Sequence, residues 1–236
     1  MFMRNIFLGL ALSLFVAGCS YNQPTQVPTA DPFESFQEQI QGFDQSLTIE
    51  SELRNVIDQD TAPTSDYVYP MEDYVTLRTK KVFGQFIAPD SGDRFSGYHT
   101  GDDIEVVDVA AEVPFYALAD ATVLRKETVG GYGGVLIVEF VDNGTTYQAL
   151  YGHVDLNSIN AAVGESVTKG ARLGVLGDDL SSETDGERKH LHFALYPSTG
   201  TVLYAGYTAN DADLQQWVNP SDFLREAQAV VPVAAE

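Results

Sequence analysis

Short apolar segments alternate with turn signals through the central part of the sequence, and this pattern constrains the fold most. Gly130-Gly131-Tyr132-Gly133-Gly134 can form a tight turn because glycine readily adopts positive φ angles. Asp142-Asn143-Gly144, between two apolar segments, is a strong β-hairpin signal. Helix signals are nearly absent from this region and return only at residues 211–229. We therefore expect a mainly β fold, an antiparallel sandwich or barrel-like domain, with strands at 81–87, 103–109, one or two within 115–129, 135–140, 145–151 and short ones within 164–177.

Two histidines lie one residue apart in the apolar segment Lys189-His190-Leu191-His192-Phe193. In a strand both imidazoles would face the same side, because side chains alternate with a period of two. Such a pair alone is a weak indication of a metal or catalytic role. The chain has only four histidines, however, and the other two are His99 and His153. This raises the question of whether all four converge on one site.

A second polar cluster, His99-Thr100-Gly101-Asp102-Asp103, supports a metal site. His99 and Asp103 share one face of an extended chain, and Gly101 between them has no side chain to block a metal. Together with one histidine of the pair they would supply three protein ligands and leave a fourth position for water, as in catalytic zinc sites. Asp102 has the opposite parity, so we expect it to point away from the site and to be solvated.

These motifs, in this order, resemble the lysostaphin-type (LytM-domain) zinc metalloendopeptidases, a family of peptidoglycan hydrolases. The resemblance spans roughly residues 82–197 and includes segments similar to family motifs, at Val113-Pro114-Phe115-Tyr116-Ala117, at residues 132–138, at Tyr151-Gly152-His153-Val154 and at residues 163–170. It implies the LytM fold, a mainly β domain built on a duplicated hybrid motif.

The resemblance also implies roles for five residues. His99, Asp103 and His192 would bind one Zn²⁺ per chain, and His153 and His190 would be catalytic histidines beside the metal-activated water. We expect His190 to act as the base and His153 to stabilise the oxyanion, although the two roles could be exchanged. The implied reaction is the hydrolysis of peptide bonds in peptidoglycan stems or cross-links.

Two other classes of function are alternatives to a peptidoglycan endopeptidase. The family contains inactive members that bind or activate another cell-wall hydrolase, but these typically lose metal ligands, and all five positions are intact here. The histidines could also bind metal only for stability. The chain departs from the family at Glu187-Arg188-Lys189, and its loop at residues 178–188 is longer and more charged. That loop should border the cleft and influence substrate preference.

The N-terminus predicts export and lipid anchoring. The apolar run Ile6 to Val16 is too short to span a bilayer, which needs about 20 residues, but suits a signal peptide. Val16-Ala17-Gly18-Cys19 resembles the bacterial lipobox, which implies cleavage before Cys19 and its lipidation; an ordinary secretory signal is the alternative. The protein would then face the periplasm from the outer membrane of a host with two membranes, or otherwise lie on the outer face of the plasma membrane.

The expected organisation has six parts. They are a lipoprotein signal peptide (1–18), a tether (19–31), a helical stalk or regulatory segment with apolar residues at helical spacing (32–59), a linker (60–71), the metallopeptidase domain (72–226) and a C-terminal tail (227–236).

The net charge argues against nucleic acids and anionic lipid surfaces as partners, and the cysteine content excludes an intrachain disulfide. The formal net charge of -21 argues against binding to nucleic acids and against docking on anionic lipids, since both partners require a basic surface. Cys19 is the sole cysteine, which rules out an intrachain disulfide. We expect a peptidoglycan peptide as substrate and the membrane as anchor, and no oligomeric state follows from the sequence.

Overall fold

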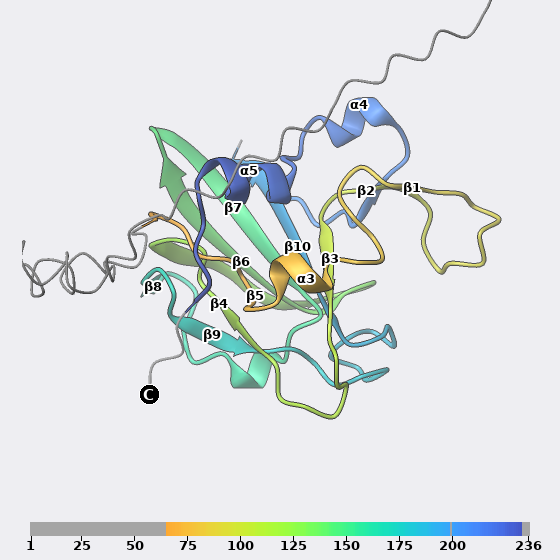
Figure 1. The fold of residues 1–236 in the computed structure, drawn as a ribbon, viewed down its shortest axis with the longest axis horizontal. Helices are drawn as coiled ribbons and strands as arrows, with labels where there is room; N and C mark the ends of the chain where they lie inside the picture. The colour runs from red at the N-terminus through yellow and green to blue at the C-terminus, as the bar shows by residue number, and fades with distance from the viewer. Residues whose placement is uncertain (1–64, 199, 233–236) are drawn as a thin grey trace, which may run out of the picture. The chain divides into compact units, whose positions relative to one another are not determined.

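The computed structural model describes residues 65–198 and 200–232, which form a mainly β structure of antiparallel sheets (Figure 1). The signal peptide, Cys19, the tether, the helical segment and the first part of the linker lie outside these residues. The largest sheet has six strands in the order β3-β10-β7-β6-β5-β8. Their bounds are Asp102–Glu105 (β3), Ala121–Val129 (β5), Gly133–Asp142 (β6), Thr145–Gly152 (β7), Ser166–Val167 (β8) and His190–Pro197 (β10).

Two smaller sheets and a few short helices complete the described part of the chain. A three-stranded sheet has the order β1-β2-β11 and a two-stranded sheet pairs β4 with β9. Among the helices that the structure describes, none has the length and apolar character needed to cross a membrane. The remaining bounds are Phe86–Ile87 (β1), Gly97–His99 (β2), Pro114–Tyr116 (β4), Arg172–Val175 (β9), Tyr207–Thr208 (β11), Tyr74–Leu77 (α3), Leu156–Ser158 (the 3₁₀ helix η1), Asp211–Leu214 (α4) and Pro220–Glu226 (α5).

The hairpin between β6 and β7 is built as the sequence predicts. Asp142 pairs with Thr145, and the two residues between them, Asn143 and Gly144, have φ angles of 47° and 81°. Two consecutive positive φ angles are the type I′ geometry, which matches the right-handed twist of paired strands. The local sequence therefore fixes the register between β6 and β7.

Both faces of the central strands are buried. Leu136 and Val138 of β6 belong to one apolar cluster, whereas Val135 and Ile137 belong to another, and all four are fully buried. Because side chains alternate across a sheet, the two clusters lie on opposite faces. This explains why the central strands are continuously apolar, and it makes β10, between β3 and β7, a rigid base for the residues at its start.

Several predicted elements are shorter than expected. Only Phe86–Ile87 of residues 81–87 is a strand, since Gly84 takes a positive φ of 76° and separates residues 81–83 from it. Strand β3 ends at Glu105, and in the following segment Val107 and Val109 are 86% and 50% exposed, so these two side chains do not hold the segment against the core.

The predicted helix at residues 211–229 is divided into α4 and α5. Between them Val218 forms a β-bridge with Leu195, and its N–H donates to the Leu195 carbonyl. Pro220 then starts α5 with Asn219 as its cap. Proline has no N–H to donate inside a helix, so it starts a new helix and does not continue the first.

The packed domain extends beyond the predicted limits of 72 and 226. Tyr67 and Met71 are buried in the main core, and Val68 forms a parallel bridge with Val230. The polar, proline-containing composition of this segment indicated a linker, so its apolar residues were not expected to be part of the core. The last residues of that linker and the first of the predicted tail are therefore structural parts of the domain.

Candidate metal centre

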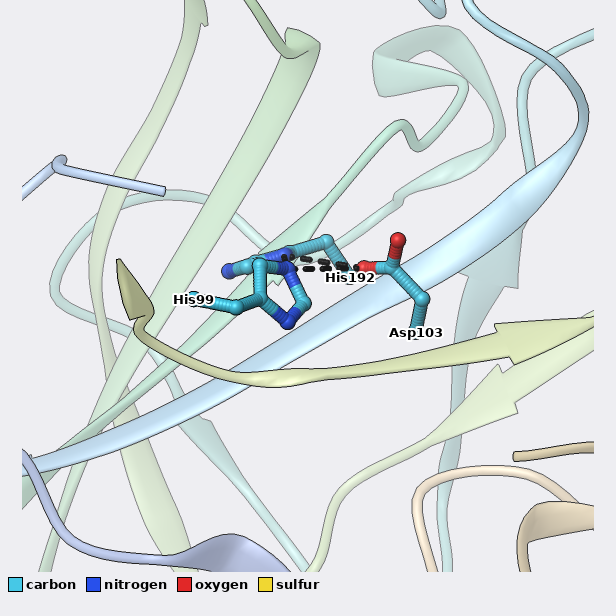
Figure 2. Close-up of side chains that lie close together, drawn as sticks. All are labelled: His99, Asp103 and His192. Atoms are coloured by element: carbon cyan, nitrogen blue, oxygen red, sulfur yellow. Dashed lines mark hydrogen bonds and ion pairs between the residues drawn. The ribbon is translucent and has the colours of Figure 1, made fainter. Parts of the chain in front are cut away.

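Three side chains from three strands converge on one point (Figure 2). His99 Nε2 lies 3.1 Å from His192 Nδ1 and 3.2 Å from Asp103 Oδ1, and His192 Nδ1 lies 3.1 Å from Asp103 Oδ1. All three residues are at most 3% exposed. The three atoms thus form a nearly equilateral, buried triangle.

Strand register brings two of these residues together. His192 on β10 is directly opposite Asp103 on β3 and opposite Gly152 at the end of β7. His99 reaches the same point from β2, across a turn that Thr100 fixes by donating from its hydroxyl to the Ala205 carbonyl at 2.6 Å. A three-stranded and a six-stranded sheet therefore share this site.

Gly101 is required by close packing at the turn. A Cβ there would lie 2.5 Å from the Phe193 carbonyl oxygen and 2.9 Å from His192 Nε2. The sequence suggested that glycine leaves room for a metal. The structure shows that it leaves room for the ring and backbone of the opposing strand.

The triangle fits a zinc ion. Two ligand atoms about 2.0–2.1 Å from a tetrahedral ion are about 3.4 Å apart, close to the 3.1–3.2 Å separations seen here. His99 Nδ1 and His192 Nε2, the second nitrogens of the two rings, are buried and have no hydrogen-bond partner among the described residues. Three nitrogen or oxygen donors without cysteine are typical of catalytic zinc sites.

The electrostatics of the cluster favour the forms that bind a metal. Burial opposes ionisation of Asp103, but the attraction of His190 and His99 and hydrogen bonds from His190 and His192 hold the pKa of its carboxyl well below the usual range. Burial lowers the pKa of His192 to about 4. At neutral pH the cluster thus contains a carboxylate and a neutral imidazole, as metal ligation requires.

The other two histidines lie beside the triangle. His190 shares the face of β10 with His192, and its Nδ1 is 2.8 Å from the Arg188 carbonyl oxygen. This contact places one ring proton on Nδ1, so Nε2, which lies 3.3 Å from Asp103 Oδ2, is the nitrogen that can gain or lose a proton. The ring of His153 lies 4.3 Å from that of His190, and burial followed by the charge of His190 keeps the pKa of His153 well below its usual value.

All five predicted residues line one pocket of about 370 Å³. Glu187 and Arg188 also line it, so the charged loop does border the cleft. The sequence did not identify the aromatic part of the lining. Tyr132, which packs on Gly152, lies within a segment that carried the family resemblance, whereas no signal marked Tyr207, whose ring is 5.0 Å from His99.

The prediction that Asp102 is solvated is wrong. Asp102 points away from the metal cluster, as its parity predicts, but it is fully buried. Its Oδ2 accepts hydrogen bonds from Tyr74 Oη and Ser221 Oγ, both at 2.6 Å, and its Oδ1 accepts one from Phe83 N at 2.9 Å. The far face of β3 is covered by α3 and α5, which the parity argument could not reveal.

The chain is similar to one family of known proteins and to several solved structures. Residues 97–204 match the model of Peptidase family M23. Similar solved structures include LytU (21% identity over 71% of this chain and 89% of that chain, TM-score 0.44) and CbpA from L. salivarius REN (18% identity, 70% and 97%, TM-score 0.45). A zinc-containing peptidase from Vibrio cholerae is also similar (22% identity, 57% and 37%, TM-score 0.43). None of the curated proteins matches this chain.

Proposed function

We propose that this chain, whose residues 97–204 match the model of Peptidase family M23, is a zinc metalloendopeptidase that hydrolyses peptide bonds in peptidoglycan stems or cross-links. The observation that carries the proposal is the buried triangle of His99 Nε2, Asp103 Oδ1 and His192 Nδ1, with sides of 3.1–3.2 Å. His153 and His190 complete the set of five residues that the reaction needs.

The chemistry divides between the metal and the chain. A bound Zn²⁺ would supply polarisation of a carbonyl and a lowered pKa of water. His190 is suited to accept a proton at Nε2, because the Arg188 carbonyl holds the proton of the neutral ring on Nδ1. His153, kept neutral by burial, can donate one ring N–H to negative charge that develops on the substrate. The contact with the Arg188 carbonyl therefore favours His190 as the base and His153 as the residue that stabilises the oxyanion.

The test separates metal binding from turnover. We expect His192→Ala to lose zinc, and His190→Ala to retain zinc and to lose hydrolysis of purified peptidoglycan. Zinc content is measured together with mass spectrometry of the released muropeptides, which also identifies the cleaved bond. If wild-type protein binds about one zinc per chain and neither substitution changes hydrolysis, the enzymatic assignment is wrong.

The competing function is an inactive module that regulates another cell-wall hydrolase. The presence of all five residues in one pocket argues against it. A wild-type chain that binds zinc, releases no muropeptide alone, and stimulates a second hydrolase would favour the regulatory function.

We propose also that the protein is exported and anchored in the cell envelope by lipid on Cys19. The proposal rests on the short apolar segment and the lipobox-like Val16-Ala17-Gly18-Cys19. Labelling of cells with a fatty acid should mark the wild-type chain. Equal labelling of Cys19→Ala would contradict attachment at this residue.

A further inference from the structure

Arg188 contacts two of the five site residues with different groups. Its backbone carbonyl lies 2.8 Å from His190 Nδ1, and its Nη2 donates to Asp103 Oδ2 at 2.9 Å. The residue stands in the charged segment that departs from the family pattern, two positions before β10. The Arg188 side chain is therefore a feature of the site that the family pattern does not include.

Glu105 holds the guanidinium in place. Glu105 is opposite His190 in the pairing of β3 with β10, and it lies two residues after Asp103, on the same face of β3. Arg188 Nε donates to both Glu105 oxygens at 3.0 and 3.1 Å, and Nη2 donates to Oε1 at 2.6 Å. The side chains of Arg188 and Glu105 are only 25% and 11% exposed. A partly desolvated pair of this kind is stronger and more directional than a surface ion pair.

The two oxygens of Asp103 consequently have different surroundings. Oδ1 faces His99 and His192 within the triangle, whereas Oδ2 faces Arg188 Nη2 and lies 3.3 Å from His190 Nε2. We propose that Arg188, held by Glu105, is a positioning residue that keeps Asp103 Oδ2 away from the metal, so that Asp103 supplies a single ligand oxygen. The proposal rests on the proposed zinc site. A carboxylate restricted to one oxygen leaves a coordination position for water or substrate.

The coordination number of a substituted metal tests this directly. Co²⁺ can replace Zn²⁺ in the purified full chain, and its visible absorption weakens as the coordination number rises. In Arg188→Ala we expect weaker absorption, because Asp103 Oδ2 becomes free to bind the ion. We also expect the dissociation constant for Zn²⁺ to rise about tenfold, a typical effect of removing a group that orients a ligand.

Glu105→Gln provides a second, nearly isosteric variant that retains an acceptor for Arg188. It should change the cobalt spectrum in the same direction and by less. Circular dichroism checks that each variant is folded. An unchanged cobalt spectrum in both folded variants would overturn the proposal, whatever happens to hydrolysis.

Arg94→Ala is the matched control. Arg94 donates to the carbonyl and carboxylate of Asp185 in the same loop, at 2.6 and 2.8 Å, and it makes no contact with Asp103. Its cobalt spectrum should equal that of wild type. An equal spectral change in Arg94→Ala and Arg188→Ala would assign the effect to loop order and overturn the proposal. A wild-type chain that binds neither ion would instead overturn the proposed function itself.

Discussion

His153 has an unusual backbone conformation, with a φ of 62° directly after β7. Its carbonyl accepts a hydrogen bond from Gly177 N at 2.9 Å, which helps to hold the turn. A left-handed conformation in a non-glycine residue costs about 1–3 kcal/mol and is often found at functional sites. At this position it directs the imidazole towards His190. The backbone thus supports the catalytic role proposed for this residue.

Burial of neutral His153 should make the metal-free protein sensitive to acid. The unfolded chain protonates this ring below the ordinary pKa of 6.5, whereas the folded chain does not until much lower pH. Stability is therefore lost as the pH falls below 6.5. Between about pH 7.5 and about pH 5.5, one such group contributes a loss of about 1.4 kcal/mol.

His153→Asn isolates this contribution, because asparagine tolerates positive φ but does not titrate. With a chelator present, urea unfolding at the two pH values should show a loss that is about 1.4 kcal/mol smaller in the variant than in wild type. An equal pH dependence in both proteins would contradict the assignment of a neutral His153.

The adjacent residues Asp102 and Asp103 of strand β3 face opposite sides of the strand and have different roles. Asp103 faces the metal cluster, while Asp102 faces a network that includes Tyr74 of α3 and Ser221 of α5. Arg78 adds a cation 3.6 Å from the Asp102 carboxylate. The network joins helices from both ends of the domain, and it lies behind the strand that carries the candidate ligand Asp103. Asp102 therefore contributes to the site through the position of β3.

Replacement of Asp102 should be strongly destabilising. Asp102→Ala leaves several buried donors and a cation without a partner, which costs about 3 kcal/mol or more. Tyr74→Phe removes one hydrogen bond of the same network and should cost about 1 kcal/mol. Both values are the change in the free energy of unfolding in urea. A loss for Asp102→Ala that does not exceed the loss for Tyr74→Phe would show that the carboxylate is not the centre of the network.

The candidate metal site lies between two sheets of the domain, since His99 belongs to the three-stranded sheet and Asp103 and His192 to the six-stranded sheet. An ion bound at this point would cross-link them in the folded state only. Metal binding should therefore be linked to the stability of the whole domain.

Removal of zinc should lower the melting temperature of the wild-type chain. Free zinc at a hundredfold excess over the dissociation constant contributes about 2.7 kcal/mol to the folded state. Differential scanning calorimetry with and without a chelator measures the shift, and added zinc should reverse it. His192→Ala should show no zinc-dependent shift, while His190→Ala should respond like wild type. A wild-type melting temperature that does not respond to zinc would contradict the site.

Local patterns in the sequence determined much of this protein. The type I′ turn at Asn143 and Gly144 depends on the φ angles that these two residues tolerate, so it was predictable from them. The common face of His190 and His192 follows from strand alternation. The spacing of His99, Asp103 and the histidine pair, together with the resemblance, predicted which side chains gather in the pocket.

Tertiary structure alone decided the contacts that adjust the site. Arg188 meets Glu105 and Asp103 across more than 80 positions of sequence, through the pairing of β10 with β3. Asp102 became a buried centre of hydrogen bonds because α3 and α5 cover the back of its strand. Alternation and turn propensity are properties of neighbouring residues. Which strands pair, and what covers each face, depends on the packing of segments far apart in the chain.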